Sequence, residues 1–199
     1  TPAETCTAHP NAVDTPIASI SSDWVACHPS SRAFDTQHSS RRGLALQNGN
    51  RTALVTGNPC FYKVACSSAI GKDVGNTAMT IVIDKTHGSY LYMGACFSES
   101  PVDVYPDHRT NGKLIGWRGQ YLYHHFRGGR LGQEWMSGDT ISMKLDRTKR
   151  TLAAMHHRTG DIEVLELNDV ATDTVYHWYV ALLHEGDQVS FSCVPKHQK

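Results

Sequence analysis

The chain has 199 residues, and its 19 Lys and Arg residues balance its 19 Asp and Glu residues, so the net charge at neutral pH is zero. This length suits one domain of fair size, which can bury enough surface to be stable without a metal ion or a disulfide. The balanced charge disfavours binding to nucleic acid or anionic membranes, because both depend on a basic excess. No apolar run approaches the ~20 residues that span a bilayer. We therefore expect a soluble protein without a membrane span.

The first residue is Thr1 rather than Met, so we expect a fragment or a processed product in which any targeting segment is hidden. The six cysteines are Cys6, Cys27, Cys60, Cys66, Cys96 and Cys193. They are too sparse for a dense disulfide framework, and no Cys-x-x-Cys pair marks a zinc site. We expect reduced, structural thiols in an intracellular, cytoplasmic protein, with three disulfides as the alternative.

The domain organisation is indicated by a change in composition near the N-terminus. Residues 1–22 are rich in Thr, Ala, Ser and Pro and lack apolar periodicity, which predicts a tail or a strap laid over the domain. Residues 23–199 instead show short β-like runs separated by turn residues, and no repeat of 20–50 residues is apparent. The sequence therefore predicts a single domain over residues 23–199.

Two hairpins are expected in the first half of that domain. Residues 43–47 and 52–56 flank an Asn-Gly-Asn sequence at 48–50, which is a strong hairpin turn. The β-branched run 79–83 is followed by turn residues and then by residues 89–96, which we expect to pair with it. Both pairs are typical of antiparallel sheets.

Further β-like runs separated by turn residues follow later in the chain, and they occupy residues 139–145, 151–155, 162–167, 178–183 and 188–193. Apolar and polar residues alternate from Thr140 onward, which would bury Ile141, Met143 and Leu145 on one face. The one helix candidate, residues 65–70, is short and ends at Gly71. Turn signals about every ten residues indicate an antiparallel β-sandwich or barrel, so the predicted fold class is all-β.

Several motifs occur in a recognisable order. They are Ile81-Val82-Ile83-Asp84 with residues 89–96, Gly116-Trp117, Gly138-Asp139-Thr140-Ile141 with Leu145-Asp146 and Thr151-Leu152, and residues 178–183 with Val189-Ser190-Phe191. In this order they resemble the SPRY (B30.2-like) family, whose IGV-type strand, GW segment, GDxI…LD…TL core and closing strands they match. The resemblance covers most of residues 24–193, and it is most specific from Gly138 to Leu152.

The resemblance implies a two-sheet antiparallel β-sandwich of the SPRY, concanavalin-like type. Family members grip a short peptide or a protein surface with loops on this rigid scaffold, and function then resides in the loops. The expected function is thus a non-catalytic protein-interaction module with no cofactor, within a larger scaffold, a ubiquitin-ligase adaptor or a multiprotein complex. The expected partner is a protein or peptide, and a small-molecule ligand is not indicated.

The segment from Tyr105 to Arg130 holds the best candidates for partner binding, because Tyr, Trp and Arg bury large areas and still form hydrogen bonds. The candidate residues are Tyr105, Asp107, Arg109, Trp117, Arg118, Tyr121, Tyr123 and Arg127. A competing interpretation places Trp117, Tyr121 and Tyr123 partly in the core. Trp24 and Trp178 are expected to be core residues.

Other functions receive weaker support. The 12 histidines invite a metal-site hypothesis, but the neighbours in His124-His125 and in His156-His157 would point to opposite faces of a strand. No Gly-x-Ser-x-Gly elbow or His-Glu-x-x-His motif is present, so neither an enzyme nor a metal site is expected. Stacking on single-stranded nucleic acid is disfavoured by the neutral charge. The runner-up function is a lectin-like, carbohydrate-binding sandwich.

Overall fold

The computed structural model describes residues 33–37, 39–40, 42–57, 62–88, 91–97, 114–118, 121–123, 133–167 and 174–192. These residues form twelve β-strands in two sheets. Within these ranges no helix has the length and the apolar character that a bilayer crossing requires. The predicted all-β fold class is confirmed.

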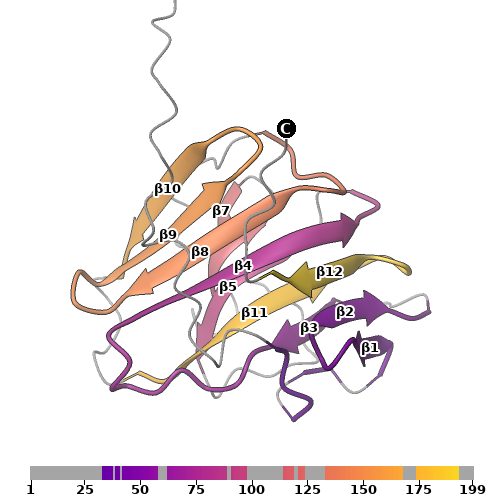
Figure 1. Cartoon of the computed structure of the whole chain (residues 1–199), viewed down its shortest axis with the longest axis horizontal. Coiled ribbons are helices and arrows are strands. Elements are labelled where there is room, and N and C mark those ends of the chain that lie inside the picture. Colours follow the sequence, from indigo (N-terminus) through magenta and orange to yellow (C-terminus); the bar gives the residue numbers. More distant parts are fainter. Residues whose placement is uncertain are drawn as a thin grey trace, which may run out of the picture.

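The larger sheet has seven strands in the order β1-β2-β12-β4-β8-β9-β10, and it lies in front in Figure 1. Each strand is antiparallel to its neighbours. The strand bounds are Leu44–Gln47 for β1, Thr52–Val55 for β2, Gln188–Phe191 for β12, Asn76–Lys85 for β4, Thr140–Asp146 for β8, Thr151–His156 for β9 and Asp161–Glu166 for β10.

The smaller sheet has five strands in the order β3-β11-β5-β6-β7, and these pairs are antiparallel as well. It stacks behind the larger sheet, so the molecule is a two-layer sandwich (Figure 1). The strand bounds are Lys63–Cys66 for β3, Tyr176–Leu182 for β11, Tyr92–Phe97 for β5, Leu114–Arg118 for β6 and Tyr121–Tyr123 for β7.

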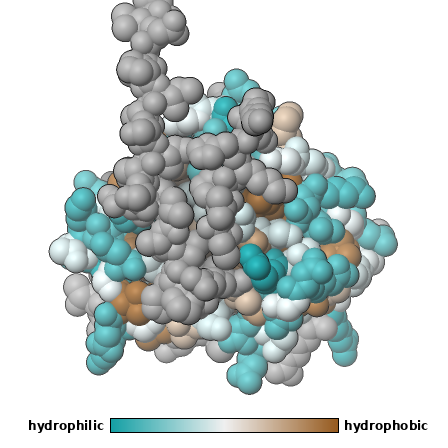
Figure 2. All heavy atoms as spheres, in the orientation of Figure 1, coloured by the Kyte–Doolittle hydropathy of each residue, from teal (hydrophilic) through white to brown (hydrophobic). Residues whose placement is uncertain are grey.

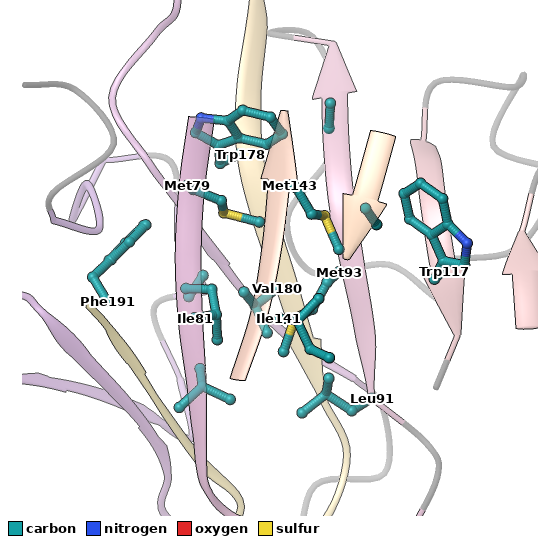
Figure 3. Close-up of a cluster of buried hydrophobic side chains, with 14 of the residues drawn as sticks. Met79, Ile81, Leu91, Met93, Trp117, Ile141, Met143, Trp178, Val180 and Phe191 are labelled. Carbon is teal, nitrogen blue, oxygen red and sulfur yellow. The ribbon is translucent and has the colours of Figure 1, made fainter. Parts of the chain in front are cut away.

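The main core fills the space between the sheets (Figure 3). Its fully buried members include Met79, Ile81, Ile141 and Met143 from the larger sheet and Met93, Trp117, Trp178 and Val180 from the smaller one. The predicted burial of Ile141, Met143 and Leu145 is confirmed, as is the core position of Trp178. Trp24 lies outside the described residues.

A second, smaller apolar cluster lies on the opposite face of the five-stranded sheet. Trp178 and Val180 of β11 belong to the main core, whereas the alternate residues Tyr179 and Ala181 belong to this second cluster. Its other buried members are Tyr62, Val64, Cys66, Tyr92 and Cys96. Both faces of the smaller sheet are therefore apolar around β11, which explains why this strand reads as a continuous apolar run.

Two of the predicted turns are confirmed. β1 and β2 pair across the Asn-Gly-Asn turn, where Asn48, Gly49 and Asn50 all have positive φ angles of 53°, 65° and 62°. β8 and β9 form the hairpin expected from the Gly138 to Leu152 motif, and Gly138 has φ of 94° at its entry. Glycine and asparagine tolerate this left-handed backbone better than other residues.

Two expectations are wrong. The run in β4 does not pair with β5, because β4 lies between β12 and β8 while β5 belongs to the other sheet. Both strands send apolar side chains into one core, so the connection between them arches from one sheet to the other, and alternation alone does not identify this. The helix candidate is also wrong, since Ala65 and Cys66 pair with Val180 and Tyr179 of β11.

Candidate recognition surface at one end of the sandwich

Four described turns gather at one end of the sandwich, and we call them the turn platform. They comprise residues 86–88 after β4, 133–139 before β8, 157–160 between β9 and β10, and 183–187 between β11 and β12. Backbone hydrogen bonds bring them together: the Ile83 amide donates to the Asp139 carbonyl over 2.8 Å. The platform thus combines segments that are distant in sequence.

Asp139 is a buried anchor for two of these turns. Its side chain is 1% exposed, and its Oδ1 accepts a hydrogen bond from Nε of Arg158 at 2.6 Å. Its Oδ2 accepts from Nη2 of Arg158 at 3.1 Å and from the Met136 amide at 2.9 Å. Nε2 of His156 lies 3.0 Å from the same oxygen. A bidentate Arg–carboxylate pair of this kind fixes orientation as well as distance.

The protonation of Asp139 follows from these neighbours. Burial raises its pKa, but hydrogen bonds from His156, Arg158 and the Met136 amide lower it, and together they hold the pKa of Asp139 well below its usual range. The same interaction raises the pKa of Arg158. The pair is therefore ionised at neutral pH, and it serves as a structural link.

Arg158 extends this link to the rest of its turn. Its Nη1 donates to Oε1 of Gln133 at 3.1 Å, and its Nη2 donates to the Glu134 carbonyl at 2.8 Å. The turn between β9 and β10 is thereby joined to the segment that precedes β8.

Asp187 is the second buried anchor, with a side chain that is 2% exposed. Its Oδ1 accepts from the His87 amide at 2.9 Å and lies 3.0 Å from Nδ1 of the same residue. Its Oδ2 accepts from the His184 amide at 2.9 Å. This carboxylate therefore joins the turn after β4 to the turn between β11 and β12.

A third link connects the two anchored halves. The Thr86 amide donates to Oγ of Ser137 at 2.9 Å, and the Gly138 amide donates to the Ile83 carbonyl at 2.7 Å. The four turns consequently form one hydrogen-bonded unit. Such cross-linked turns present their outward side chains at a low cost in conformational entropy.

The platform displays an apolar side chain beside polar ones. Met136 is 52% exposed, although the preceding Trp135 and the Asp139 carboxylate that accepts from the Met136 amide are both buried. The His87 side chain is 43% exposed. Methionine is enriched in protein interfaces, so an exposed Met on a fixed turn suits recognition.

In the described ranges no group of three or more His, Cys, Asp or Glu side chains is placed to hold a metal ion. The predicted divergence of one histidine pair is confirmed, because His156 turns to Asp139 while Nε2 of His157 lies 2.8 Å from Oγ of Ser142. His124 and His125 lie outside the described residues.

The structure places one group of predicted site residues in a single hairpin of the smaller sheet. Arg118 of β6 lies opposite Tyr121 of β7, and Gly116 lies opposite Tyr123. Arg118 is also in register with Tyr92, which begins β5 just after the connection from the platform. The turn between β6 and β7 is therefore at the platform end of the sandwich.

Trp117 occupies a different environment from its neighbours in that hairpin. Its ring is fully buried and belongs to the main core (Figure 3). Trp117 thus has the core position that the competing interpretation assigned to it, and its ring supports the sheet from within.

The other predicted residues, Tyr105, Asp107, Arg109 and Arg127, lie outside the described residues. The first three belong to the connection from β5 to β6. β5 ends at Phe97, opposite Tyr176, and β6 begins at Leu114. The strand ends at Phe97 and Leu114 therefore lie at the end of the sandwich opposite the platform.

Sequence reasoning missed the two anchors and Met136, although a signal was present. A Gly-Asp dipeptide stands at the start of β8, β10 and β12, and Gly138, Gly160 and Gly186 all have positive φ. In two of these dipeptides the aspartate is buried, whereas Asp161 is exposed. A repeated Gly-Asp at strand starts indicates a turn whose carboxylate can bind nearby backbone amides.

The chain is similar in structure to several SPRY domains. The SPRY domain of human HERC1 has a TM-score of 0.59 and 18% identity over 83% of this chain and 100% of that domain. The PSpry domain of TRIM65 has a TM-score of 0.58 and 14% identity over 83% of this chain and 89% of the other. A human SPRY domain has a TM-score of 0.57 and 12% identity over 78% of this chain and 98% of the other.

Sequence comparisons gave no further relationship. No protein-family model matches the chain. No curated protein matches it either. The likeness therefore concerns the arrangement of the two sheets, and it agrees with the SPRY-type motifs of the sequence. We conclude that the chain has the fold of a SPRY domain.

Proposed function

We propose that the chain is a non-catalytic protein-interaction module that recognises a peptide or protein surface through turns at one end of its SPRY-type sandwich. It acts within a larger scaffold, adaptor or multiprotein complex. The observation that carries this proposal is the turn platform, in which Asp139, Asp187 and the hydrogen bond from Thr86 to Ser137 tie four turns into one unit that exposes Met136.

The chemistry of the surface supports a protein partner. Two buried carboxylates are fully engaged in holding backbone and side chains, so they stabilise the platform without presenting charge to solvent. Met136 supplies an apolar contact of the kind found at interface centres. Arg118 and Tyr121 lie at the same end of the sandwich, and both residue types dominate binding hot spots.

The wider candidate set remains part of the proposal. Tyr105, Asp107 and Arg109 belong to the β5–β6 connection, and Arg127 follows β7. We assign these four residues and Tyr123 to a second contact region that widens the specificity of the module.

Affinity capture followed by binding measurements tests this function. The full chain is immobilised, exposed to lysate of its source organism under reducing conditions, and the retained proteins are identified by mass spectrometry. Each candidate partner is then purified and titrated against the chain by isothermal calorimetry. We expect at least one saturable, stoichiometric partner.

Variants then locate the binding face. Met136→Ala, Arg118→Ala and Tyr105→Ala should each weaken binding of the purified partner by about 1–2 kcal/mol and leave the melting temperature nearly unchanged. Gln47→Ala is the control, because Gln47 is exposed at the far end of β1. Wild-type affinity of both Met136→Ala and Arg118→Ala would refute the platform as the binding face, and wild-type affinity of Tyr105→Ala would refute the second contact region.

A glycan array separates this function from the lectin-like alternative. Saturable retention on specific glycans, displaced by a simple sugar, would support carbohydrate binding. Such retention without any protein partner would overturn the proposed function.

A further inference from the structure

The outer edge of β10, which begins directly after the platform turn at 157–160, is a second candidate for recognition. β10 is the last strand of the seven-stranded sheet, and the only described strand that pairs with it is β9 (Figure 1). It has six residues. An edge strand offers unpaired N–H and C=O groups to another chain, and natural proteins usually block such edges.

The other sheet edges are covered or short. β3 is covered by the segment before β1: the Asp35 amide donates to the Cys66 carbonyl at 2.6 Å, and Oγ of Ser39 accepts from the Cys66 amide at 3.0 Å. Oγ of Ser40 accepts from the Val64 amide at 2.9 Å. β1 has four residues and β7 has three. β10 is thus the longest edge without a described partner.

At two apolar residues of β10, the backbone N–H and C=O groups face the side of the strand that is opposite to β9. The Leu167 amide donates to the Arg150 carbonyl at 2.8 Å, so this pair is a hydrogen-bonded one. Antiparallel ladders alternate, and Ile162 and Val164 therefore occupy non-hydrogen-bonded positions opposite Met155 and Ala153. Their N–H and C=O groups point away from β9.

The side chains of the same two residues are exposed. Ile162 is 53% exposed and Val164 is 55% exposed. Figure 2 shows the face of this sheet, where hydrophilic residues cover most of the coloured surface and apolar ones form separate small patches. β10 contains no Lys and no Pro, two of the residues that commonly prevent edge pairing, and its charged residues are acidic.

The charged side chains of β10 determine which sequences its edge favours. Asp161 and Glu163 alternate with Ile162 and Val164 and lie on the opposite face of the strand, beside the buried Leu165. Glu166 ends the strand on the face of the two apolar residues, and all three ionisable residues of β10 are acidic. From residue 161 to 164, a strand that pairs with β10 therefore meets apolar neighbours on one face and carboxylates on the other, which favours alternating apolar and basic residues.

A second copy of the chain is a poor occupant. If Ile162 of one copy lay opposite Val164 of another in an antiparallel pair, the two Glu163 residues would lie directly opposite each other. Like charges at such positions are destabilising. In this register the acidic strand disfavours pairing with itself.

We infer that the edge of β10 binds an extended segment of a partner protein, in which apolar residues alternate with Lys or Arg, as an added β-strand. Backbone hydrogen bonds at Ile162 and Val164 supply affinity, and the carboxylates of Asp161 and Glu163 supply sequence preference. This site does not depend on the turn platform, so either can fail without the other.

A synthetic peptide tests the inference. A capped, fluorescein-labelled seven-residue peptide of alternating Lys and Val is titrated with the full chain, and binding is followed by fluorescence anisotropy. We expect saturable binding that weakens in high salt, because exposed charge pairs are screened. The same peptide with Glu in place of Lys, and one with N-methylated backbone at alternate residues, should not bind.

Variants of the chain identify the edge. Glu163→Lys should lower the affinity for the peptide about tenfold, because it replaces an attractive cross-strand pair by a repulsive one. Asp73→Lys makes the same charge change at an exposed residue between β3 and β4, outside the platform and β10, and it should leave the affinity unchanged. Val164→Pro should abolish binding yet keep the β9 pairing, since proline is tolerated where the strand N–H faces outward.

Three results would overturn the inference. They are absence of peptide binding, equal loss of affinity in Glu163→Lys and Asp73→Lys, and full binding of the N-methylated peptide. Hydrogen exchange of the free chain gives an independent check, which does not need the proline variant to fold. The Ile162 and Val164 amides should exchange readily, and strong protection of both would show that the edge is already occupied.

Discussion

Nε of Arg158 donates to Oδ1 of Asp139 across 2.6 Å, and this pair joins the turn between β9 and β10 to the turn before β8. The acceptor is 1% exposed, while the Arg158 side chain remains 26% exposed. A buried carboxylate is costly to desolvate unless each of its oxygens is engaged, and here both accept hydrogen bonds. The pair therefore defines the shape of the platform, and its removal has measurable consequences.

Asp139→Asn should destabilise the protein by about 3 kcal/mol, because it leaves the partly buried Arg158 without its charged partner. The measurement is the free energy of unfolding in urea, followed by tryptophan fluorescence. Asp161→Asn removes an exposed carboxylate and should change that free energy by no more than about 0.5 kcal/mol. If both variants unfold at the same urea concentration, Asp139 is not an anchor.

The same residue predicts how stability depends on pH. Since the folded-state pKa of Asp139 is lowered, below an unfolded value of about 3.9, its stabilisation is complete above about pH 5 and is lost as the pH falls through the folded pKa. The gap in unfolding free energy between wild type and Asp139→Asn should thus be largest near pH 6 and shrink below about pH 4. A gap that stays constant down to about pH 2.5 would contradict this assignment.

Gly116 permits the close approach of β6 to β5. A Cβ atom at this position would lie 2.1 Å from the Met93 carbonyl oxygen and 2.7 Å from Cα of Gly94. Because both neighbours are backbone atoms, Gly116→Ala should cost about 3 kcal/mol. Gly75→Ala is the matched control, since a Cβ at Gly75 would meet nothing within 4 Å. Thermal denaturation of the two variants should separate them clearly, and similar melting temperatures would disprove the steric argument.

The core prediction compares two apolar residues of the same sheet. Leu145 is 1% exposed and packs in the main core, whereas Ile162 is 53% exposed on β10. Leu145→Ala should cost about 2–5 kcal/mol through lost burial and the cavity that remains. Ile162→Ala should cost about 0.5 kcal/mol or less. Urea denaturation of both variants gives the comparison, and a small effect of Leu145→Ala would mean that its site collapses or is not core.

The sequence predicts the local parts of this fold well. The Asn48 to Asn50 turn and the alternation of Ile141, Met143 and Leu145 depend on neighbouring residues alone, and both are confirmed. The assignment of β4 and β5 to different sheets depends on which strands meet across the core. Short connections are compatible with a hairpin and with an arch, so periodicity does not decide between them.

The candidate site is harder to predict for the same reason. Asp139 and Asp187 act on residues from other turns, such as Arg158 and His87, and only the fold brings these together. Aromatic and Arg content, by contrast, does not separate surface from core. Trp117 and Arg118 are both candidates by residue type, but Trp117 is fully buried.

The smaller apolar cluster contains two buried thiols that should be protected from modification. Cys66 and Cys96 are both free and buried, with Sγ atoms 3.9 Å apart. They lie on β3 and β5, which are separated by β11, and the strand spacing of about 4.8 Å puts their backbones beyond the usual span of a disulfide. The hydrogen bond with Cys96 and burial raise the pKa of the Cys66 thiol well above its usual value, which disfavours the reactive thiolate.

Native protein treated with iodoacetamide at about pH 8, where an ordinary thiol is partly ionised, should leave both cysteines unmodified. The same treatment in urea should modify both, and site-resolved mass spectrometry distinguishes these two from the other cysteines of the chain. Rapid labelling of Cys66 in the native protein, or recovery of a Cys66–Cys96 disulfide peptide after mild oxidation, would show that this face of the five-stranded sheet opens. Protection of both thiols would instead establish it as a second packed layer that supports the sheet from its outer side.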